Sequence, residues 1–446
     1  LVMAVQAGRN DVIEFLLDRG ASISQQDADG HSLVQWAVVC GQLETLNLLI
    51  ERGADVTTHD KFKATALHYA TANDELPDNV STSILLTLIR KGAPINSRDV
   101  DERTPLLWSA SNGNIDGLVS LKQSGGDILS VDRDRMSALH MSASHGSAMM
   151  TEKMLDIVPS SMINQSERSG CTPLFYSVNY GYYEPSRLLL SKGANTNHQD
   201  HRLRTPAHLA ATKGQLRILK LLKQFGASFE MQNYRGDLPL HEAVQTGTKD
   251  VVEWLLALHP SSINAACHSG RTPLHIAAAR GHMSIVILLC NQSAYINPLM
   301  LYRNELVTPL DLAKRQEHSN VVDYLTMRQG AMRAEDIPEE ERRDMREHIE
   351  ESMNEAKLKY GKKIRIGEEE DEMESKKTRK RDESMESSVN GKGERMNHVS
   401  SIEGKRIPRS TSTSDLKDEE DEDYEGNRLV EERIERIVRE ELRAVR

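Results

Sequence analysis

The sequence lacks the features of membrane-spanning, disulfide-linked and secreted proteins. It has no run of about 18 apolar residues, so we expect no membrane-spanning helix. Its four cysteines lie far apart and without the C-x-x-C spacing of zinc sites, which predicts reduced thiols in an intracellular protein. The first eight residues have no basic start and no long apolar stretch, so they do not resemble a signal peptide.

Catalytic motifs are missing as well. The sequence contains no G-x-x-x-x-G-K-[ST] or G-x-G-x-x-G phosphate-binding loop, no H-E-x-x-H zinc-protease motif and no G-x-S-x-G nucleophile motif. We therefore expect neither enzymatic activity nor a cofactor or metal. The net charge of −11 argues against a general affinity for nucleic acid, so no direct nucleic-acid contact is expected.

Apolar residues are scarce in the last quarter of the chain, where charge is concentrated. Residues 329–446 hold 26 basic and 34 acidic residues, and Leu, Ile, Val and Phe make up only 17 of these 118 positions. That share is below the ~20% needed to offset the entropy of ordering the chain. We expect a short amphipathic helix or an extra cap at 329–360, a disordered charged tail at 361–426, and a short amphipathic helix at 427–446.

A short pattern recurs throughout residues 1–328, and its clearest copy is Thr272-Pro273-Leu274-His275. The first position of the pattern recurs at intervals of 33 to 39 residues: Ser32, Thr65, Thr104, Ser137, Thr172, Thr205, Leu238, Thr272 and Thr308. Threonine can cap the first turn of a helix, which also tolerates the following proline. A short helix, a glycine at a chain reversal, a second helix with an apolar face and a polar hairpin then complete each unit.

These units resemble the ankyrin repeat, with ten copies of which the first is truncated. The resemblance implies an all-α ankyrin-repeat solenoid of stacked helix pairs with β-hairpin tips, which binds proteins and is not catalytic. Residues 1–8 match the helix that follows the marker, so we expect the chain to begin inside a repeat. For the histidines at the fourth marker position, the resemblance implies structural hydrogen bonding: His68, His140, His208, His241 and His275.

Departures from the repeat predict local differences in structure. Six extra residues near positions 74–79 are expected in the loop between the two helices of their unit. The tenth unit carries Asp311 instead of histidine, and we expect Gln316-Glu317 to replace its Gly-His pair. A more polar last unit is typical of the C-terminal cap that a repeat stack needs for solubility.

Ankyrin proteins usually meet their partners with the hairpin tips and the exposed face of each first helix. At such positions, units five to eight carry basic and aromatic residues that we call the arginine stripe: Arg133, Arg135, His145, Arg168, Tyr180, Arg202, Arg204, Lys213, Tyr234 and Arg235. Arginine and tyrosine are enriched where a surface anchors a protein partner. The stripe predicts a partner with an acidic segment, and ordinary solvated charge at hairpin tips is the alternative.

The tail carries several further signals. Its acidic runs, 368–372 and 418–423, predict a weak intramolecular contact with the arginine stripe that competes with outside partners. A basic string resembles a nuclear-import signal, with a solvated charge run as the alternative: Lys376, Lys377, Arg379, Lys380 and Arg381. Ser410, Ser412 and Ser414 follow a basic segment and are candidate phosphorylation sites. The helix at 427–446 is expected to fold against a partner or to be one arm of a longer coiled coil.

The sequence as a whole predicts a non-enzymatic scaffold or adaptor that binds proteins through the hairpin tips and concave face of its array and carries a phosphorylatable acidic tail. We expect it in the cytoplasm, with the nucleus as a second location. The alternatives are a nuclear or chromatin-associated regulator, or the targeting subunit of a kinase or ubiquitin ligase. Some ciliary scaffolds share the plan of an ankyrin array and a charged tail, but no motif here supports that placement.

Overall fold

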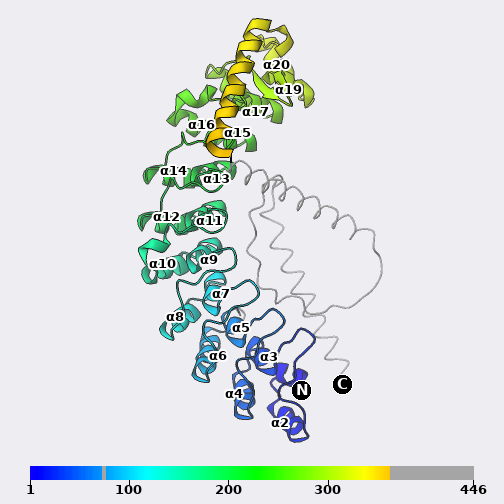
Figure 1. The fold of residues 1–446 in the computed structure, drawn as a ribbon, viewed down its shortest axis with the longest axis vertical. Helices are drawn as coiled ribbons and strands as arrows, with labels where there is room; N and C mark the ends of the chain where they lie inside the picture. The colour runs from blue at the N-terminus through cyan, green and yellow to red at the C-terminus, as the bar shows by residue number, and fades with distance from the viewer. Residues whose placement is uncertain (73–76, 362–446) are drawn as a thin grey trace, which may run out of the picture. The chain divides into compact units, whose positions relative to one another are not determined.

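Pairs of short helices follow one another along the chain and form an all-α stack (Figure 1). The computed structural model describes residues 1–72 and 77–361. The first helices of the pairs are α1 (Val2–Gln6), α3 (Leu33–Val39), α5 (Ala66–Ala72), α7 (Pro105–Ser111), α9 (Ala138–His145), α11 (Pro173–Asn179), α13 (Pro206–Thr212), α15 (Pro239–Thr246), α17 (Pro273–Arg280) and α19 (Pro309–Arg315). The second helices are α2 (Asn10–Asp18), α4 (Leu43–Glu51), α6 (Asp78–Arg90), α8 (Ile115–Gln123), α10 (Ala148–Ile157), α12 (Tyr183–Ser191), α14 (Leu216–Gln224), α16 (Lys249–Leu258), α18 (Met283–Asn291) and α20 (Ser319–Gln329).

The marker residues begin the first helices as predicted. The hydroxyl of Thr104 accepts a hydrogen bond from the backbone N–H of Leu107 at 3.4 Å, and Pro105 occupies the first turn of α7. Ser32 caps α3 in the same way, through the backbone N–H of Gln35. These bonds satisfy backbone donors that a helix start leaves without partners.

The glycine that follows a first helix is required for two reasons: its backbone has a positive φ, and a side chain there would collide with a residue of the next unit. Gly281 has a φ of 70°, and a Cβ placed there would lie 2.7 Å from Nδ1 of His318 in the next unit. The equivalent residue of unit ten is Glu317, with a φ of 60°. The Gly-His pair of the other units therefore corresponds to Glu317-His318 in unit ten. The prediction that Gln316-Glu317 replaces this pair was wrong, because only the glycine is replaced and the histidine is present as His318.

The core lies between the two helices of each pair and between successive pairs. In unit nine, Leu274 of α17 and Ile285, Val286 and Leu289 of α18 are all buried. α17 contacts α15 on one side and α19 on the other. Each helix pair therefore buries its apolar face only together with its neighbours, as in other solenoids.

Irregular units differ from the others where the repeat pattern breaks. Of the extra residues expected near 74–79 in unit three, 74–76 lie outside the described part, and 78 and 79 belong to α6 rather than to a loop. α6 has 13 residues where most second helices have nine. Units five and eight contain short 3₁₀ helices: Pro159 precedes η1 (Ser160–Met162), and Pro260 begins η2 (Pro260–Asn264). The enlarged connection of unit nine forms an antiparallel hairpin of β1 (Met300–Tyr302) and β2 (Glu305–Val307).

The chain continues beyond α20 and packs back onto the last units. η3 (Ala334–Asp336) follows α20, and a helix then spans residues 339–361. The carboxylate of Asp311 accepts hydrogen bonds from the backbone N–H groups of Thr308 at 3.1 Å and Ala334 at 2.8 Å. Ala334 and Ile337 form a small buried cluster with Leu299. This segment thus covers the end of the stack.

The sequence predictions for the rest of the tail lie outside the described residues, apart from Gly361. They are the charged tail to residue 426, the helix at 427–446, the acidic runs, the nuclear-import string and the three candidate phosphorylation sites.

A core substitution should release the helix of residues 339–361 without unfolding the array. Ile349 is only 2% exposed and its Cδ1 lies against Gly270. We expect Ile349→Ala to abolish amide-exchange protection within 339–361, because losing a buried isoleucine costs about 2–5 kcal/mol. Leu358→Ala is the matched control, since Leu358 is 88% exposed. If hydrogen exchange shows equal protection of residues 339–361 in both variants, the packing of Ile349 against Gly270 is contradicted.

Candidate partner-binding surface

The hairpin tips of successive units are joined by a ladder of main-chain hydrogen bonds. An N–H group of each tip donates to a carbonyl of the preceding tip, with N···O distances of 2.8 to 3.1 Å. Through the described residues these bonds run from Lys61 to Asp29, Val100 to Phe62, Arg133 to Asp101, Arg168 to Asp134, His201 to Ser169, Tyr234 to Arg202, His268 to Arg235 and Leu301 to Ser269. The ladder sets the register of the tips, so side chains at equivalent positions form rows.

A buried acidic side chain supports most tips from beneath. One carboxylate oxygen of Asp132 accepts hydrogen bonds from the N–H groups of Asp134 at 2.9 Å and Met136 at 2.8 Å. Asp60 holds the preceding hairpins in the same way, through Phe62 and Ala64. Burial raises the pKa of Asp132. These carboxylates are buried and hydrogen-bonded to the main chain of the hairpins, so they are not available at the surface to contact a partner.

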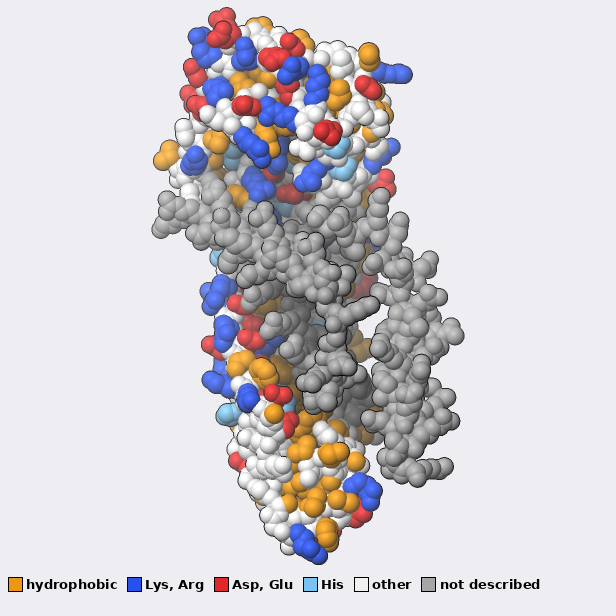
Figure 2. Space-filling view, turned by 90° about the vertical axis from the view of Figure 1, so that its right-hand side faces the viewer, with side chains coloured by type: hydrophobic (Ala, Val, Ile, Leu, Met, Phe, Trp, Pro, Cys, Tyr) orange, Lys and Arg blue, Asp and Glu red, His pale blue; other side chains and the backbone are white. Residues whose placement is uncertain are grey.

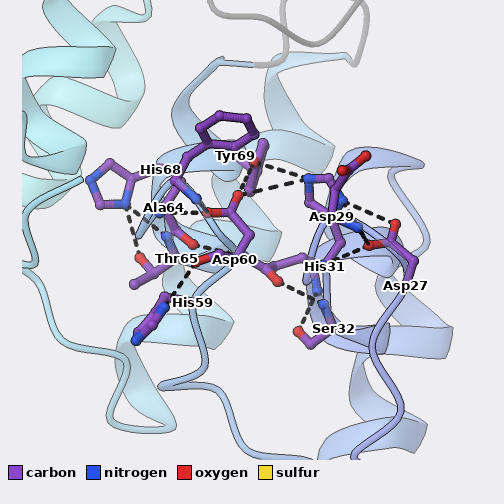
Figure 3. A network of polar contacts seen from close by, with 12 residues as sticks. Asp27, Asp29, His31, Ser32, His59, Asp60, Ala64, Thr65, His68 and Tyr69 are labelled. Atoms are coloured by element: carbon purple, nitrogen blue, oxygen red, sulfur yellow. Dashed lines mark hydrogen bonds and ion pairs between the residues drawn. The ribbon is translucent and has the colours of Figure 1, made fainter. Parts of the chain in front are cut away.

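The tips of units two and three share a polar network (Figure 3). Nδ1 of His31 lies 3.0 Å from a carboxylate oxygen of Asp27, and its Nε2 lies 3.3 Å from the hydroxyl of Tyr69. The Tyr69 hydroxyl in turn donates to Asp60. Trp36 adds a hydrogen bond from its indole N–H to Asp27 at 3.0 Å. The network ties one hairpin to the next through side chains as well as through the main chain.

The marker histidines join each unit to the next, as the family resemblance implied. Nδ1 of His208 accepts a hydrogen bond from the backbone N–H of Thr205 at 3.1 Å, so the ring proton is on Nε2. Nε2 donates to the carbonyl of Asp237 in the following unit at 3.0 Å. Equivalent bonds to the following unit run from His68 to Arg103, His140 to Cys171, His241 to Ala265 and His275 to Val307.

Other side chains at the marker position also bridge the start of their own helix and the chain that follows. Gln35 stands at the marker position of unit two, where its Oε1 accepts from the N–H of Ser32 at 2.7 Å. Its Nε2 donates to the carbonyl of Ala64 at 2.8 Å. Asp311 accepts from Thr308 and Ala334 in unit ten. The position therefore serves to link neighbouring units, and the imidazole is one way to do so.

Protonation of these histidines opposes folding. Burial lowers the pKa of His140 and His208 to about 4 and that of His275 to about 3. Unfolded histidine has a pKa near ~6.5, so below that pH the unfolded chain binds protons that the folded chain does not. The free energy of unfolding therefore falls as the pH drops from about 6.5 to about 4, by up to about 1.4 kcal/mol per pH unit for each histidine.

Replacing one marker histidine by glutamine should weaken this pH dependence. In His208→Gln, the amide can repeat the bonds that Gln35 makes, so the stability at neutral pH should change by less than about 1 kcal/mol. We expect the urea midpoint to fall less steeply between pH 7 and pH 5 than in the parent chain. His348→Gln, at an exposed position of the last helix, is the control. An unchanged slope in His208→Gln would refute the role of this histidine.

The structure brings four arginines of the predicted stripe to four consecutive tips: Arg133, Arg168, Arg202 and Arg235. Arg133 and Arg168 lie 3.7 Å and 3.8 Å from Asp101 and Asp134 of the preceding tips. Both arginine side chains are more than half exposed, and exposed ion pairs contribute ~0–1 kcal/mol. These two pairs therefore orient the guanidinium groups along the tips without removing their charge from solvent.

Two stripe residues are not exposed anchors. Tyr234 is only 7% exposed, and the guanidinium of Arg235 lies over its ring at 5.1 Å. Arg204 points inward, with its Nε 2.8 Å from the carboxylate of Asp200. Burial alone would lower the pKa of Arg204, but Asp200 raises it. The prediction that these two side chains are exposed was wrong, because the sequence pattern does not show which side chains of a hairpin turn inward.

The remaining stripe residues lie beside the tips or at the ends of first helices. Arg135 is exposed at a turn position with a φ of 66°. His145 is exposed at the end of α9, and its ring covers Gly113. Tyr180 and Lys213 are half-buried at the ends of α11 and α13, and burial raises the pKa of Tyr180. His145, Tyr180 and Lys213 thus occupy equivalent positions, at the ends of three successive first helices.

Sequence reasoning missed an aromatic row in the N-terminal units. Trp36, Tyr69 and Trp108 occupy the position after the fourth marker residue, so the repeat register could have revealed them. Phe62 is 55% exposed at the tip position that Arg202 and Arg235 occupy further along. Figure 2 looks onto the side to which the hairpins project, and hydrophobic side chains gather there over the N-terminal units at the bottom.

Comparison with known proteins assigns the family. The family model described as "Ankyrin repeats (3 copies)" matches residues 1–99, 106–200, 189–267 and 256–335. The chain belongs to the ankyrin repeat family. This confirms the resemblance predicted from the marker spacing.

Individual relatives of this ankyrin array differ from one another. Mouse inversin is 27% identical over 245 residues, which are 53% of this chain and 20% of inversin. The mouse B-cell lymphoma 3 protein homolog is 29% identical over 52% of this chain and 44% of its own length. The transient receptor potential cation channel subfamily A member 1 of Drosophila melanogaster is 28% identical over 66% of this chain and 22% of its own. Each match thus covers less than half of the relative.

The part of the ankyrin chain that the structure describes offers no metal site or membrane span. No group of three or more His, Cys, Asp or Glu side chains among these residues could hold a metal ion. In the same ranges, no helix has the length and apolar character needed to cross a membrane.

Proposed function

We propose that this ankyrin protein is a non-enzymatic scaffold whose hairpin tips bind an acidic segment of a partner protein. The observation that carries the proposal is that each of four consecutive tips carries an arginine: Arg133 and Arg168 at the residue that donates to the ladder, and Arg202 and Arg235 at the residue after it. The main-chain ladder holds the four tips in register, so these arginines are positioned before a partner arrives. Preorganisation of this kind reduces the entropy lost on binding.

The spacing of the tips favours an extended ligand. Packed helices are about 8–10 Å apart, and successive tips repeat at a similar distance. A polyproline II segment rises about 3.1 Å per residue and has three residues per turn. Such a segment with an acidic residue at every third position would place one carboxylate at each tip. An α-helix would need acidic residues about six or seven positions apart to do the same.

The sequence-based alternatives share this array and differ in what the tail does. A nuclear or chromatin-associated regulator would use the basic string at 376–381, and a targeting subunit would deliver a kinase or ubiquitin ligase to the partner held by the array. The cytoplasm remains our proposed location, and phosphorylation at Ser410, Ser412 and Ser414 would add negative charge to the tail.

Charge reversal at two tips should abolish binding of an acidic peptide. The probe is a fluorescent peptide with glutamate at every third position, and its affinity is measured by anisotropy. Each arginine lost removes an exposed attraction of ~0.2–1 kcal/mol and adds a repulsion of similar size. We expect Arg202→Glu with Arg235→Glu to weaken binding at least about tenfold, and the effect to shrink as salt is added.

The matched control reverses two charges on the outer side of the array. Arg217 and Lys220 are exposed on α14, where the guanidinium of Arg217 lies over the ring of Tyr183 at 5.0 Å. Arg217→Glu with Lys220→Glu changes the net charge by the same amount, so we expect it to leave the affinity nearly unchanged. Equal losses in both double variants would contradict the proposed site and indicate a general charge effect.

A further inference from the structure

The helix of residues 339–361 carries the chain back along the hairpins, toward the arginine tips. The guanidinium of Arg346 donates to the carbonyl of Asn304 in the turn of the β1–β2 hairpin. Ile349 lies against Gly270 in the preceding hairpin. Figure 1 shows this helix in orange, running from the level of α19 and α20 back to the level of α15. The helix thus runs opposite to the order of the units.

The end of this helix lies beside the tip of the ninth unit. Ile349 packs on Gly270, two residues from His268, and the helix continues from there to the level of α15 (Figure 1). Burial is the main cause of the lowered pKa of His268, and the charge of Lys359 acts in the same direction. The N–H of His268 is bonded to the carbonyl of Arg235 at 3.1 Å. Arg235 is therefore the tip arginine nearest to the end of the described chain.

The next charged run of the sequence is within reach of those tips. Residues 368–372 are Glu-Glu-Glu-Asp-Glu and begin seven residues after Gly361. Seven extended residues span at most about 25 Å. Successive tips are about 8–10 Å apart, so both Arg235 and Arg202 fall within that distance. The connecting residues Lys362, Lys363 and Arg365 are basic, so the acidic run is the part that the arginines attract.

We propose that the acidic run at 368–372 binds the arginine tips of its own chain at Arg235 and Arg202 and so competes with acidic partners. The inference rests on the proposed function, because it names the in-chain occupant of the same surface. A tether of this length supplies an effective concentration in the millimolar range. A contact too weak to hold a free peptide is therefore sufficient to reduce the affinity for a partner.

A zero-length cross-link tests the contact directly in the full chain. The Arg235→Lys variant places an amine at the tip, and carbodiimide joins it to a carboxylate in contact with it. We expect a cross-linked peptide that connects position 235 to residues 368–372, identified by mass spectrometry. The proposal is overturned if that peptide is absent and the introduced lysine is acetylated as fast as Lys220, which is exposed on α14.

Competition with the labelled acidic peptide tests the consequence. Replacing residues 368–372 by serine should tighten peptide binding to the full chain about tenfold, because the in-chain competitor is removed. The control replaces the five acidic residues at 418–422, which lie 57 residues after Gly361. Effective concentration falls with about the −3/2 power of tether length, so this run should compete roughly twentyfold less. Equal effects of the two replacements would overturn the proposal.

The two proposals fail in different ways. If reversing Arg202 and Arg235 leaves peptide binding unchanged, the proposed function fails together with this inference. If that reversal abolishes binding but replacing 368–372 changes nothing, the tips bind acidic segments and only the in-chain contact is wrong. Unaltered thermal unfolding of each variant shows that the array is folded in both measurements.

Discussion

The array depends on polar bonds that join each repeat to the next. A marker side chain accepts a hydrogen bond from the backbone at the start of its own helix and, in most units, donates another to a carbonyl of the following unit. Both partners are buried, and an unsatisfied buried donor or acceptor costs about 1–3 kcal/mol. The stacked units are therefore held at one relative position, which apolar contacts alone would specify less strictly.

Rigid stacking has a direct consequence for recognition. A solenoid has no single pocket, so it recognises a partner through rows of side chains that repeat from unit to unit. The main-chain ladder of the hairpin tips extends the same order to the surface. Along the tips, the residues change from Lys61 and Phe62 in the N-terminal part to one arginine per tip in four consecutive units in the middle. One array can therefore present an apolar and aromatic region and a basic region to different segments of a partner.

The repeat architecture was predictable because it depends on local chemistry. Threonine and proline begin helices, glycine permits the reversal, and these preferences act within a few residues. The individual exposure of side chains was less predictable. Tyr234 and Arg204 were expected at the surface, but one supports Arg235 from below and the other pairs with Asp200. Both side chains turn inward through contacts within their own hairpin, which the marker spacing does not show.

The sequence by itself determined the family, the number and limits of the units, and the concentration of negative charge in the tail, because these follow from residue order and short-range preferences. Only the tertiary structure decided which arginines lie on consecutive tips and which are turned inward. It also showed that the helix of residues 339–361 runs back along the hairpins and ends beside His268. The physical reason is that exposure and proximity result from contacts between units about 33 residues or more apart, and the local pattern within one unit does not contain them.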